Sequence, residues 1–289
     1  MKNTHVMKYT DHISLKDNLT NKSSLDTEVF IKDGYGNILF HGKNMTAFGG
    51  RQLLLEKSFG IAPDASKHLL LNDMLGIPHS ENTSVITDNE DRITNYFLIG
   101  NGAENLSVPG VTYTPHNYET KLYNTVPFRC VPFSSDLSPS EATNYRLRKI
   151  ITIDGNDYVA YYAKKFNAGV VYTEYNGSNY VPLEAHTVPV DEGDSAHPLA
   201  GGSVLSYIQF TLTVEQNEFK EFYRLTHNDM LTGAALNEIG LVMGRDLPNT
   251  LDSNRVELAA AELFAKLTST SVPLDSESSR RVVEYRIYS

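Results

Sequence analysis

Apolar and polar positions alternate along several short segments of the chain, as they do in strands that bury one face. The clearest example is SVLSYIQFTLTV, from Ser203 to Val214, and VVEYRIYS repeats the period from Val282 to the end. The apolar residues that would share one face of the first segment are Val204, Ile208, Phe210, Leu212 and Val214. One buried and one solvated face is typical of antiparallel sheets, so both segments predict strands of such a sheet.

Two further segments predict hairpins. TEVFIKDGYGNILFHG, from Thr27 to Gly42, places turn residues between two β-prone runs, and so does YRLRKIITIDGNDYVAYYAKKF, from Tyr145 to Phe166. ITNYFLIGNGAEN, from Ile93 to Asn105, reads as a strand that ends in a glycine turn. The chain is therefore expected to be mainly β.

One segment predicts a short helix. FGGRQLLLEKSF, from Phe48 to Phe59, contains three leucines in a row and is followed by Gly60, a suitable C-cap residue. NRVELAAAELFAKL, from Asn254 to Leu267, also has helical propensity, and the residues alone leave its structure open.

The remaining segments define the domain organisation. Residues 1–26 are polar and aperiodic, which predicts an N-terminal arm. Residues 61–92 and 113–202 mix apolar runs with Gly, Asn, Pro and acidic residues, which predicts long excursions. We therefore expect residues 27–289 to form a single antiparallel β-sandwich-like domain with one short helix and long loop excursions.

The composition of the chain argues against two classes of partner, nucleic acids and membranes. The chain has 289 residues and a formal net charge of -10, so it offers no basic field for nucleic acid. No apolar run approaches the roughly 20 residues that cross a bilayer, and the N-terminus lacks the apolar core of a signal peptide. These features predict a protein made in the cytosol that binds neither nucleic acid nor membrane.

Motifs for catalysis or cofactor binding are weak. The only cysteine, Cys130, excludes intrachain disulfides, and the glycines from Gly100 to Gly102 read as a tight turn because no helix pattern follows them. Five residues of one loop could hold a divalent metal, but their spacing is more typical of a solvated turn. They are His186, Asp191, Glu192, Asp194 and His197. We predict no catalytic residue, no cofactor and no metal site.

Glu238 is a lone carboxylate inside the apolar run LNEIGLVMG, from Leu236 to Gly244. A catalytic acid would need a second group placed beside it, and the sequence shows none. A buried structural carboxylate needs only donors. Backbone N–H groups of a turn, or the arginines Arg280, Arg281 and Arg286, could supply these donors.

Tyrosines border the second excursion, and Tyr172, Tyr175 and Tyr180 are its candidate interface residues. Tyrosine offers contact area at low entropic cost, which suits a protein contact or a sugar-stacking surface. The alternative is that tyrosine is simply a good strand residue.

Six segments in order carry a family resemblance. They are KNMTAFGGRQLLL from Lys43, FLIGNGAEN from Phe97, SVLSYIQFTLTV from Ser203, ALNEIGLVMG from Ala235, ELFAKLTSTSVPL from Glu262 and the terminal VVEYRIYS. In this order the chain resembles a widespread group of virion proteins of tailed bacteriophages. The resemblance assigns structural roles to Arg51, Asn237, Glu238 and Gly240. It also implies that the segment from Leu263 onward is a strand that pairs with the NEIGL strand and with the terminal strand.

The resemblance implies a non-enzymatic building block of the virion. Several copies of it would be present in each particle, and the particle would be assembled in the host bacterial cytoplasm. Its partners would be other virion proteins, and its place would be the tail or baseplate, where it would join or brace fibres. The alternatives are a neck, collar or capsid decoration protein, or a receptor-binding module for a host surface glycan. Sheet edges, the arm and the tyrosine-bearing loops would supply the contacts.

Overall fold

The fold is known from a computed structural model, which describes residues 27–78, 92–104, 111–167, 169–175, 179–180, 204–215, 217–230, 234–249, 255–274 and 280–288. The first of two sheets contains β1 (Thr27–Asp33), β2 (Ile38–Gly42), β9 (Val170–Tyr175), β10 (Asn179–Tyr180), β11 (Val204–Val214) and β14 (Arg281–Tyr288). The second contains β3 (Met45–Thr46), β4 (Ile93–Gly100), β5 (Thr125–Val126), β6 (Arg129–Pro132), β7 (Tyr145–Ile153), β8 (Asn156–Lys165), β12 (Ala235–Pro248) and β13 (Val256–Pro273).

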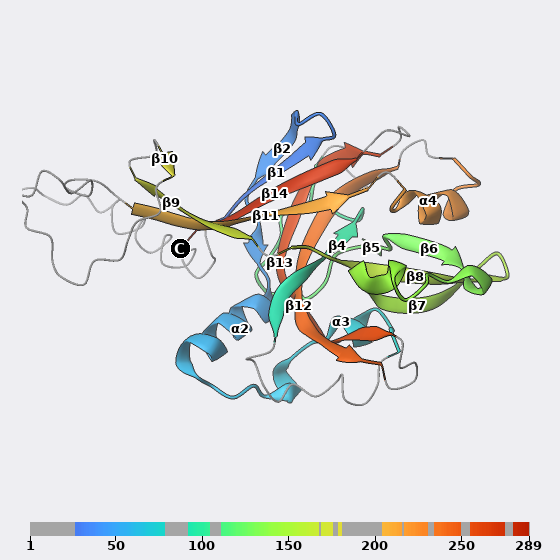
Figure 1. The fold of residues 1–289 in the computed structure, drawn as a ribbon, viewed down its shortest axis with the longest axis horizontal. Helices are drawn as coiled ribbons and strands as arrows, with labels where there is room; N and C mark the ends of the chain where they lie inside the picture. The colour runs from blue at the N-terminus through green and yellow to red at the C-terminus, as the bar shows by residue number, and fades with distance from the viewer. Residues whose placement is uncertain are drawn as a thin grey trace, which may run out of the picture.

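Both sheets are antiparallel. The six-stranded sheet has the order β10-β9-β11-β14-β1-β2, and the eight-stranded sheet has the order β3-β13-β12-β4-β8-β6, with β5 beside β4 and β7 beside β8. Figure 1 shows the two sheets packed together, with β9 and β10 at one end of the molecule and β6 to β8 at the other. The predicted mainly β, sandwich-like architecture is confirmed.

The main core lies between the sheets. β11 contributes Phe210, Leu212 and Val214 to it, and Phe97 and Ile99 of β4 come from the other sheet. The period-2 pattern of β11 thus predicts the buried face correctly from Phe210 onward. Ile208 is the exception, because its side chain is 43% exposed.

A second core covers the other face of the eight-stranded sheet. There Leu98, Val242 and Leu263 pack against Leu71 and Ile77, which come from the segment that follows the predicted helix. A strand buried on both faces needs apolar residues at successive positions rather than at alternate ones. This requirement explains why LNEIGLVMG in β12 reads as a continuous apolar run.

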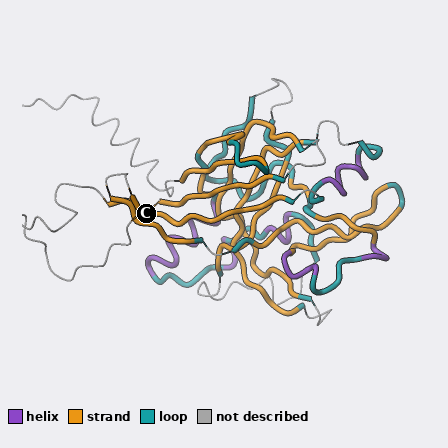
Figure 2. The backbone as a smooth tube through the Cα atoms, turned by 45° about the horizontal axis from the view of Figure 1, so that its top comes forward, coloured by secondary structure: helices purple, strands orange, loops and turns teal. Residues whose placement is uncertain are grey.

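In the part of the chain that the structure describes, three α-helices accompany the sheets (Figure 2), and one of them was predicted. α2 spans Phe48–Phe59 as expected, and Gly60 closes it in the left-handed region at φ 62°. α3 (Leu71–Met74) and α4 (Lys220–Thr226) are too short to give a sustained helical period. Within the described residues, no helix is both long and apolar enough to cross a bilayer.

β12 and β13 form the longest strand pair. β13 begins at Val256, so the segment with helical propensity is a strand from that residue onward. The predicted pairing of the LFAKL segment with NEIGL is confirmed, since Ile239 lies opposite Leu267. Its predicted pairing with the terminal strand is wrong, because β14 pairs with β1 and β11 in the other sheet.

The predicted hairpins are both present. β1 pairs with β2, and β7 pairs with β8 across a two-residue turn at Asp154 and Gly155, which have φ angles of 49° and 78°. Much of the expected excursion at 113–202 therefore belongs to the sheets, as strands β5 to β10. The expected arm, residues 1–26, lies outside the described residues.

Cys130 in β6 gives a direct test of this packing. Its side chain is 3% exposed, and burial, with the nearby charge of Glu221, raises the pKa of the thiol to about 12. We expect the folded protein to resist iodoacetamide at pH 8 and to be alkylated fully in denaturant, because the thiolate is the nucleophile. Mass spectrometry of the intact chain measures this. Equal rates with and without denaturant would contradict the buried position.

Candidate functional site

Glu238 lies on β12 and binds two loops through backbone N–H groups. Its Oε2 atom accepts hydrogen bonds from Gly102 at 2.9 Å and Asn124 at 3.0 Å, and its Oε1 atom accepts one from Tyr123 at 2.7 Å. These donors belong to the turn after β4 and to the segment before β5. Backbone groups were one of the predicted sources of donors, whereas Arg281 and Arg286 lie on β14 in the other sheet.

Lys266 of β13 supplies the charge that faces Glu238. Its Nζ atom lies 3.2 Å from Glu238 Oε1 and 2.9 Å from Glu119 Oε2, and it lies 3.1 Å from the centroid of the Tyr123 ring. The Lys266 and Glu238 side chains are 1% and 0% exposed. Removing one partner of such a pair leaves an uncompensated buried charge, which costs about 3–5 kcal/mol. We name Glu119, Tyr123, Glu238 and Lys266 the Glu238 centre.

Asn237 and Gly240 are adjacent to this centre on β12. Asn237 Oδ1 accepts a hydrogen bond from Ala103 at 2.9 Å, which ties the same turn to β12 a second time. Gly240 lies opposite Lys266, and a Cβ atom there would come within 2.7 Å of the Leu263 side chain. Asn237 thus joins a turn to β12, and the absence of a side chain at Gly240 makes room for Leu263.

Arg51 lies in the first turn of α2, where its backbone N–H donates to Ala47 O at 3.1 Å. Within the described residues, no hydrogen bond or ion pair joins Arg51 to Glu238. The helix itself reaches the centre, because Phe48 N donates to Glu119 O at 3.1 Å. Arg51 therefore belongs to the supporting helix and not to the Glu238 centre.

A second buried ionic cluster lies between α2 and β13. The His68 ring has Nδ1 2.7 Å from Glu262 Oε1 and Nε2 3.2 Å from Glu56 Oε1, and Glu262 also pairs with Arg92. The His68 side chain is 0% exposed. Because Glu56 belongs to α2 and Glu262 to β13, the His68 ring between them joins the helix to the sheet.

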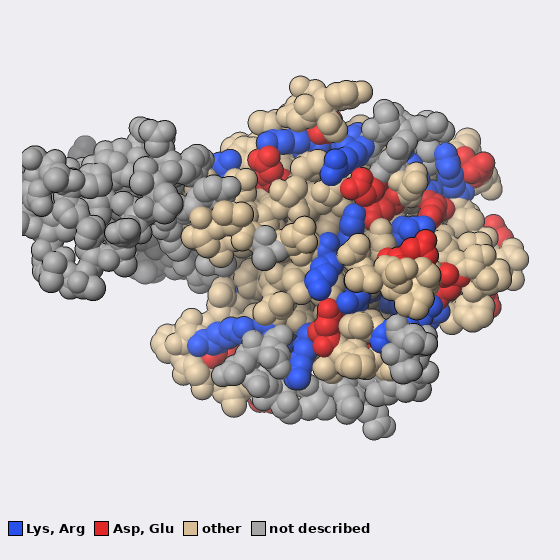
Figure 3. Space-filling view, viewed as in Figure 1, with Lys and Arg blue, Asp and Glu red and all other residues tan. Residues whose placement is uncertain are grey.

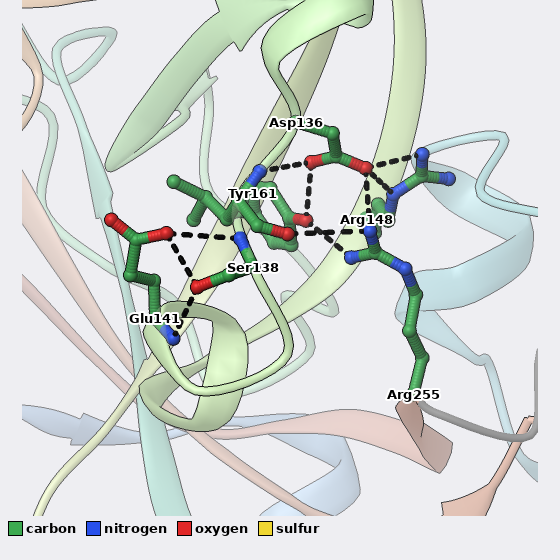
Figure 4. Close-up of polar contacts among 7 residues, drawn as sticks. Asp136, Ser138, Glu141, Arg148, Tyr161 and Arg255 are labelled. Atoms are coloured by element: carbon green, nitrogen blue, oxygen red, sulfur yellow. Dashed lines mark hydrogen bonds and ion pairs between the residues drawn. The ribbon is translucent and has the colours of Figure 1, made fainter.

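A third polar network joins the β7–β8 hairpin to the start of β13 (Figure 4). Asp136 Oδ2 accepts from Arg148 Nη2 at 2.7 Å and from Arg255 Nη2 at 2.9 Å, and Asp136 Oδ1 accepts from the Tyr161 hydroxyl at 2.7 Å. Arg255 also donates to the Tyr161 hydroxyl at 2.8 Å. One carboxylate thus holds two guanidinium groups in place, and we name these four residues the Asp136 network.

A groove of about 550 Å³ lies beside the Asp136 network. Its walls are β7, the start of β13 and the segments around Ile77 and Pro139. The charged residues that line it are Arg146, Arg148, Lys149, Arg255 and Glu257. Four basic side chains against one acidic side chain contrast with the acidic balance of the whole chain, 35 acidic to 25 basic. Carboxylates next to the lining face three of these basic groups, because Asp246 pairs with Arg146 and Asp136 pairs with Arg148 and Arg255. On the visible face of the molecule, Figure 3 likewise shows basic and acidic side chains interspersed.

The pKa of Asp136 shows how the network depends on pH. Burial would raise this pKa, but the hydrogen bonds from Tyr161 and Arg148 and the charges of Arg148 and Arg255 outweigh burial and lower it. A carboxyl whose pKa is lowered by folding stabilises the fold above its unfolded pKa, ordinarily about 3.9, and loses that contribution as the pH falls through the folded pKa.

We expect Asp136→Asn to lower the free energy of unfolding at pH 7 by about 2 kcal/mol, because hydrogen bonds to a charged group contribute about 1.5–3 kcal/mol. The difference from the parent should shrink as the pH falls below about 4. Urea titrations at pH 7 and pH 3.5 measure both values. Asp229→Asn is the control, since the Asp229 side chain is 90% exposed. A difference independent of pH would contradict the role of the charge.

The candidate interface tyrosines lie at the far end of the six-stranded sheet from β2. Tyr172 and Tyr175 are in β9 and Tyr180 is in β10. Tyr180 pairs with Glu174, so Tyr172 and Tyr180 occupy register positions of one face and Tyr175 occupies a position of the other. The five loop residues from His186 to His197, which were considered as metal ligands from the sequence, lie outside the described residues. Among the residues described, no group of three or more His, Cys, Asp or Glu side chains is arranged so that it could hold a metal ion.

Sequence reasoning missed the Asp136 network. Its members are 12, 25 and 119 positions from Asp136, and no spacing rule connects them. One local signal was available in Ser-Pro-Ser-Glu, a capping box. Ser138 N and Oγ donate to Glu141 Oε2 at 2.9 and 2.6 Å, so this box shapes the loop that carries Asp136 (Figure 4).

Comparison with known proteins places the chain in one family. A family described as of unknown function (DUF7208) matches residues 43–272. This range contains the Glu238 centre, the Asp136 network and the groove, and it leaves out β1, β2 and β14. Comparison with curated proteins and with solved structures gave no match. Since the match extends over more than half of the chain, the protein belongs to this family of unknown function, DUF7208.

Proposed function

We propose that the chain is a non-enzymatic structural subunit of a tailed-bacteriophage virion, assembled in the host cytoplasm and located in the tail or baseplate. There it would join or brace other virion proteins such as fibres, in several copies. The observation that carries the proposal is that segments of the phage-like pattern meet at one buried centre. β12 supplies Glu238, β13 supplies Lys266, and the turn after β4 supplies the Gly102 amide.

The use of every oxygen of Glu238 supports a structural role over a catalytic one. Oε2 accepts hydrogen bonds from two backbone N–H groups. Oε1 accepts a hydrogen bond from a third and lies 3.2 Å from Lys266 Nζ. A general acid or base must lie within hydrogen-bond reach of a substrate proton. The Glu238 side chain is 0% exposed, and its oxygens already accept hydrogen bonds from two loops. This supports a role in holding the fold together.

Mass spectrometry and labelling of purified particles test the proposal. We expect the chain in particles released by the cells that encode it, at a fixed ratio to the major virion proteins. Immunogold labelling should mark the tail or baseplate, whereas labelling of the neck or head would support the neck, collar or decoration alternative. A chain abundant in the lysate but absent from washed particles would overturn the proposal.

Glycan binding is the second candidate, and the tyrosines of β9 and β10 favour it. Tyr172 and Tyr180 occupy positions of one sheet face, as a stacking surface requires. A glycan array with the full chain and a Tyr172→Ala, Tyr175→Ala, Tyr180→Ala variant tests this function. Binding that the triple variant loses would support it, and no binding by the parent chain would exclude it.

A further inference from the structure

Lys266 and Glu119 are in contact inside the Glu238 centre but share no hydrogen bond. The Lys266 Nζ atom lies 2.9 Å from Glu119 Oε2, and the two side chains are 1% and 11% exposed. Both atoms are buried, and neither has a hydrogen-bond partner in the described part of the chain. Buried polar groups normally have such a partner, and an ion pair normally aligns an N–H group with the oxygen. This contact therefore differs from an ordinary ion pair.

A second buried lysine–glutamate pair shows the usual arrangement. Lys164 Nζ donates hydrogen bonds to Glu218 Oε2 and to the Thr213 carbonyl oxygen, both at 2.8 Å. The Lys164 and Glu218 side chains are 13% and 3% exposed, so they are buried to a similar degree as Lys266 and Glu119. Burial alone therefore does not explain the missing hydrogen bond between Lys266 and Glu119.

The geometry of the centre suits attack of the lysine amine on the carboxyl carbon of Glu119. A carbon–oxygen bond is about 1.2 Å long, so this carbon, Cδ, lies no more than about 4.1 Å from Nζ. The Tyr123 hydroxyl donates to the other oxygen, Oε1, at 2.5 Å. Burial, and next the hydrogen bond to Glu119, raise the pKa of Tyr123 above its usual range, so the hydroxyl keeps its proton. It can therefore stabilise negative charge that gathers on Oε1 during the attack.

Glu238 supplies a proton acceptor beside the same amine. Its Oε1 atom lies 3.2 Å from Lys266 Nζ. The Glu238 side chain is 0% exposed, so it faces Lys266 and not an outside substrate. The centre thus holds one buried cation between two buried carboxylates. Converting one ion pair into an amide removes two charges from the interior, and with them the cost of keeping both ions out of water.

We propose that Lys266 and Glu119 form an intramolecular isopeptide bond, an amide that joins Nζ to Cδ. The ammonium group passes one proton to Glu119 Oε2, and the neutral amine attacks Cδ, which places negative charge on Oε1. A second proton leaves Nζ through Glu238 to Oε2, the Cδ–Oε2 bond breaks, and water leaves as Oε1 becomes the amide oxygen. The three ammonium hydrogens end as one amide hydrogen and two water hydrogens, so the step needs no oxidant, reductant or further reactant. Glu238 ends as the carboxylate it was and keeps its structural role.

The bond fastens the segment before β5 to β13. A covalent link between residues far apart in the sequence restricts the unfolded chain, as a disulfide does. Since Cys130 is the only cysteine, the chain has no intrachain disulfide of its own. The ion pairs described above are the contacts from which the bond forms. The inference goes beyond the proposed virion function and does not depend on it, because the reaction needs only the folded chain.

Mass spectrometry of the purified full chain tests the bond. Under denaturing conditions the intact chain should be lighter than its sequence by the mass of one water. Trypsin does not cleave after an acylated lysine, so the digest should contain a branched peptide that joins residues 93–121 to residues 256–280. Fragmentation should place the junction at Glu119 and Lys266. A chain of full sequence mass, or a water loss that maps to other residues, would overturn the proposal.

Lys266→Arg separates the bond from the charge. The variant keeps a positive charge beside both carboxylates, but a guanidinium group does not lose its proton and cannot act as the nucleophile. It should have the full mass of its sequence and give no branched peptide. Lys164 and Glu218 are the control in the parent digest, and no branched peptide should join them. Water loss that persists in Lys266→Arg would overturn the proposal, and if this variant fails to fold, the peptide map of the parent decides.

Tyr123→Phe tests the hydroxyl by itself. The variant keeps the ring that lies over Lys266 and loses the donor to Glu119 Oε1. We expect the bond to form about 100-fold more slowly, the effect of removing one oxyanion donor. The measurement is the unreacted fraction of the chain at successive times after a labelling pulse. A rate equal to that of the parent would refute the proposed step.

Discussion

Glu238→Gln is expected to lower the free energy of unfolding by about 3–5 kcal/mol, the range found when one partner of a buried ion pair is removed. The amide keeps the shape of the side chain but removes the charge that faces Lys266. It also turns one oxygen into an NH₂ group that must point at backbone donors, since the two oxygens of Glu238 together accept three N–H groups. Urea unfolding followed by far-ultraviolet circular dichroism measures the change.

A double-mutant cycle separates the charge from the hydrogen bonds. Lys266→Met removes the opposing charge, and the Glu238→Gln, Lys266→Met protein should be more stable than the sum of the two single losses predicts. Glu215→Gln is the control, because that side chain is 53% exposed and lies 3.6 Å from Arg280, so its loss should stay below about 1 kcal/mol. Additive losses, or a loss at Glu238 no larger than at Glu215, would contradict the ion-pair account.

The Glu238 centre illustrates how much of the candidate site could be predicted from the sequence. The apolar run around Glu238 predicted a buried strand, and the absence of a second acid nearby in the sequence predicted a structural carboxylate. Its pairing with the LFAKL strand came from the family resemblance. Lys266 could not be identified, because which residue of β13 faces Glu238 depends on the bulges in the β12–β13 pair. Register at a bulge is set by tertiary packing.

The groove shows which part of the structure the sequence did not predict. The β7–β8 hairpin was predictable, since turn residues between two β-prone runs specify it locally. That its outer edge faces Pro78 and Val256 was not predictable, because these residues come from distant parts of the chain and meet only when β13 packs beside β7. Local sequence signals specify strands and turns. Which segments then lie beside the edge of a strand depends on how the strands pack in the whole fold.

The eight-stranded sheet carries both the buried centre and the groove. The Glu238 centre joins the loops beside β4 and β5 to this sheet, and the His68 cluster joins α2 to it. These buried contacts connect segments that lie far apart in the sequence.

Gly50→Ala is expected to destabilise the protein by about 3 kcal/mol, in the upper part of the range for overpacked sites. Helical propensity alone predicts the opposite sign, because alanine is favoured over glycine inside a helix by about 1 kcal/mol. At this position a Cβ atom would lie 2.1 Å from the backbone oxygen of Phe264 in β13. That oxygen accepts the Ala47 N–H at 2.9 Å, so α2 must leave the sheet or lose its anchoring hydrogen bond.

Gly34→Ala is the matched control for this substitution, because its nearest neighbour would be the Arg280 Cβ at 3.8 Å, an ordinary contact. It should change the free energy of unfolding by no more than about 0.5 kcal/mol, as most surface substitutions do. Urea unfolding of the two variants beside the parent measures both effects. A Gly50→Ala protein as stable as the parent would mean that α2 packs more loosely on β13 than these contacts require. In that case the glycine pair of the FGGR segment would reflect something other than close helix–sheet packing.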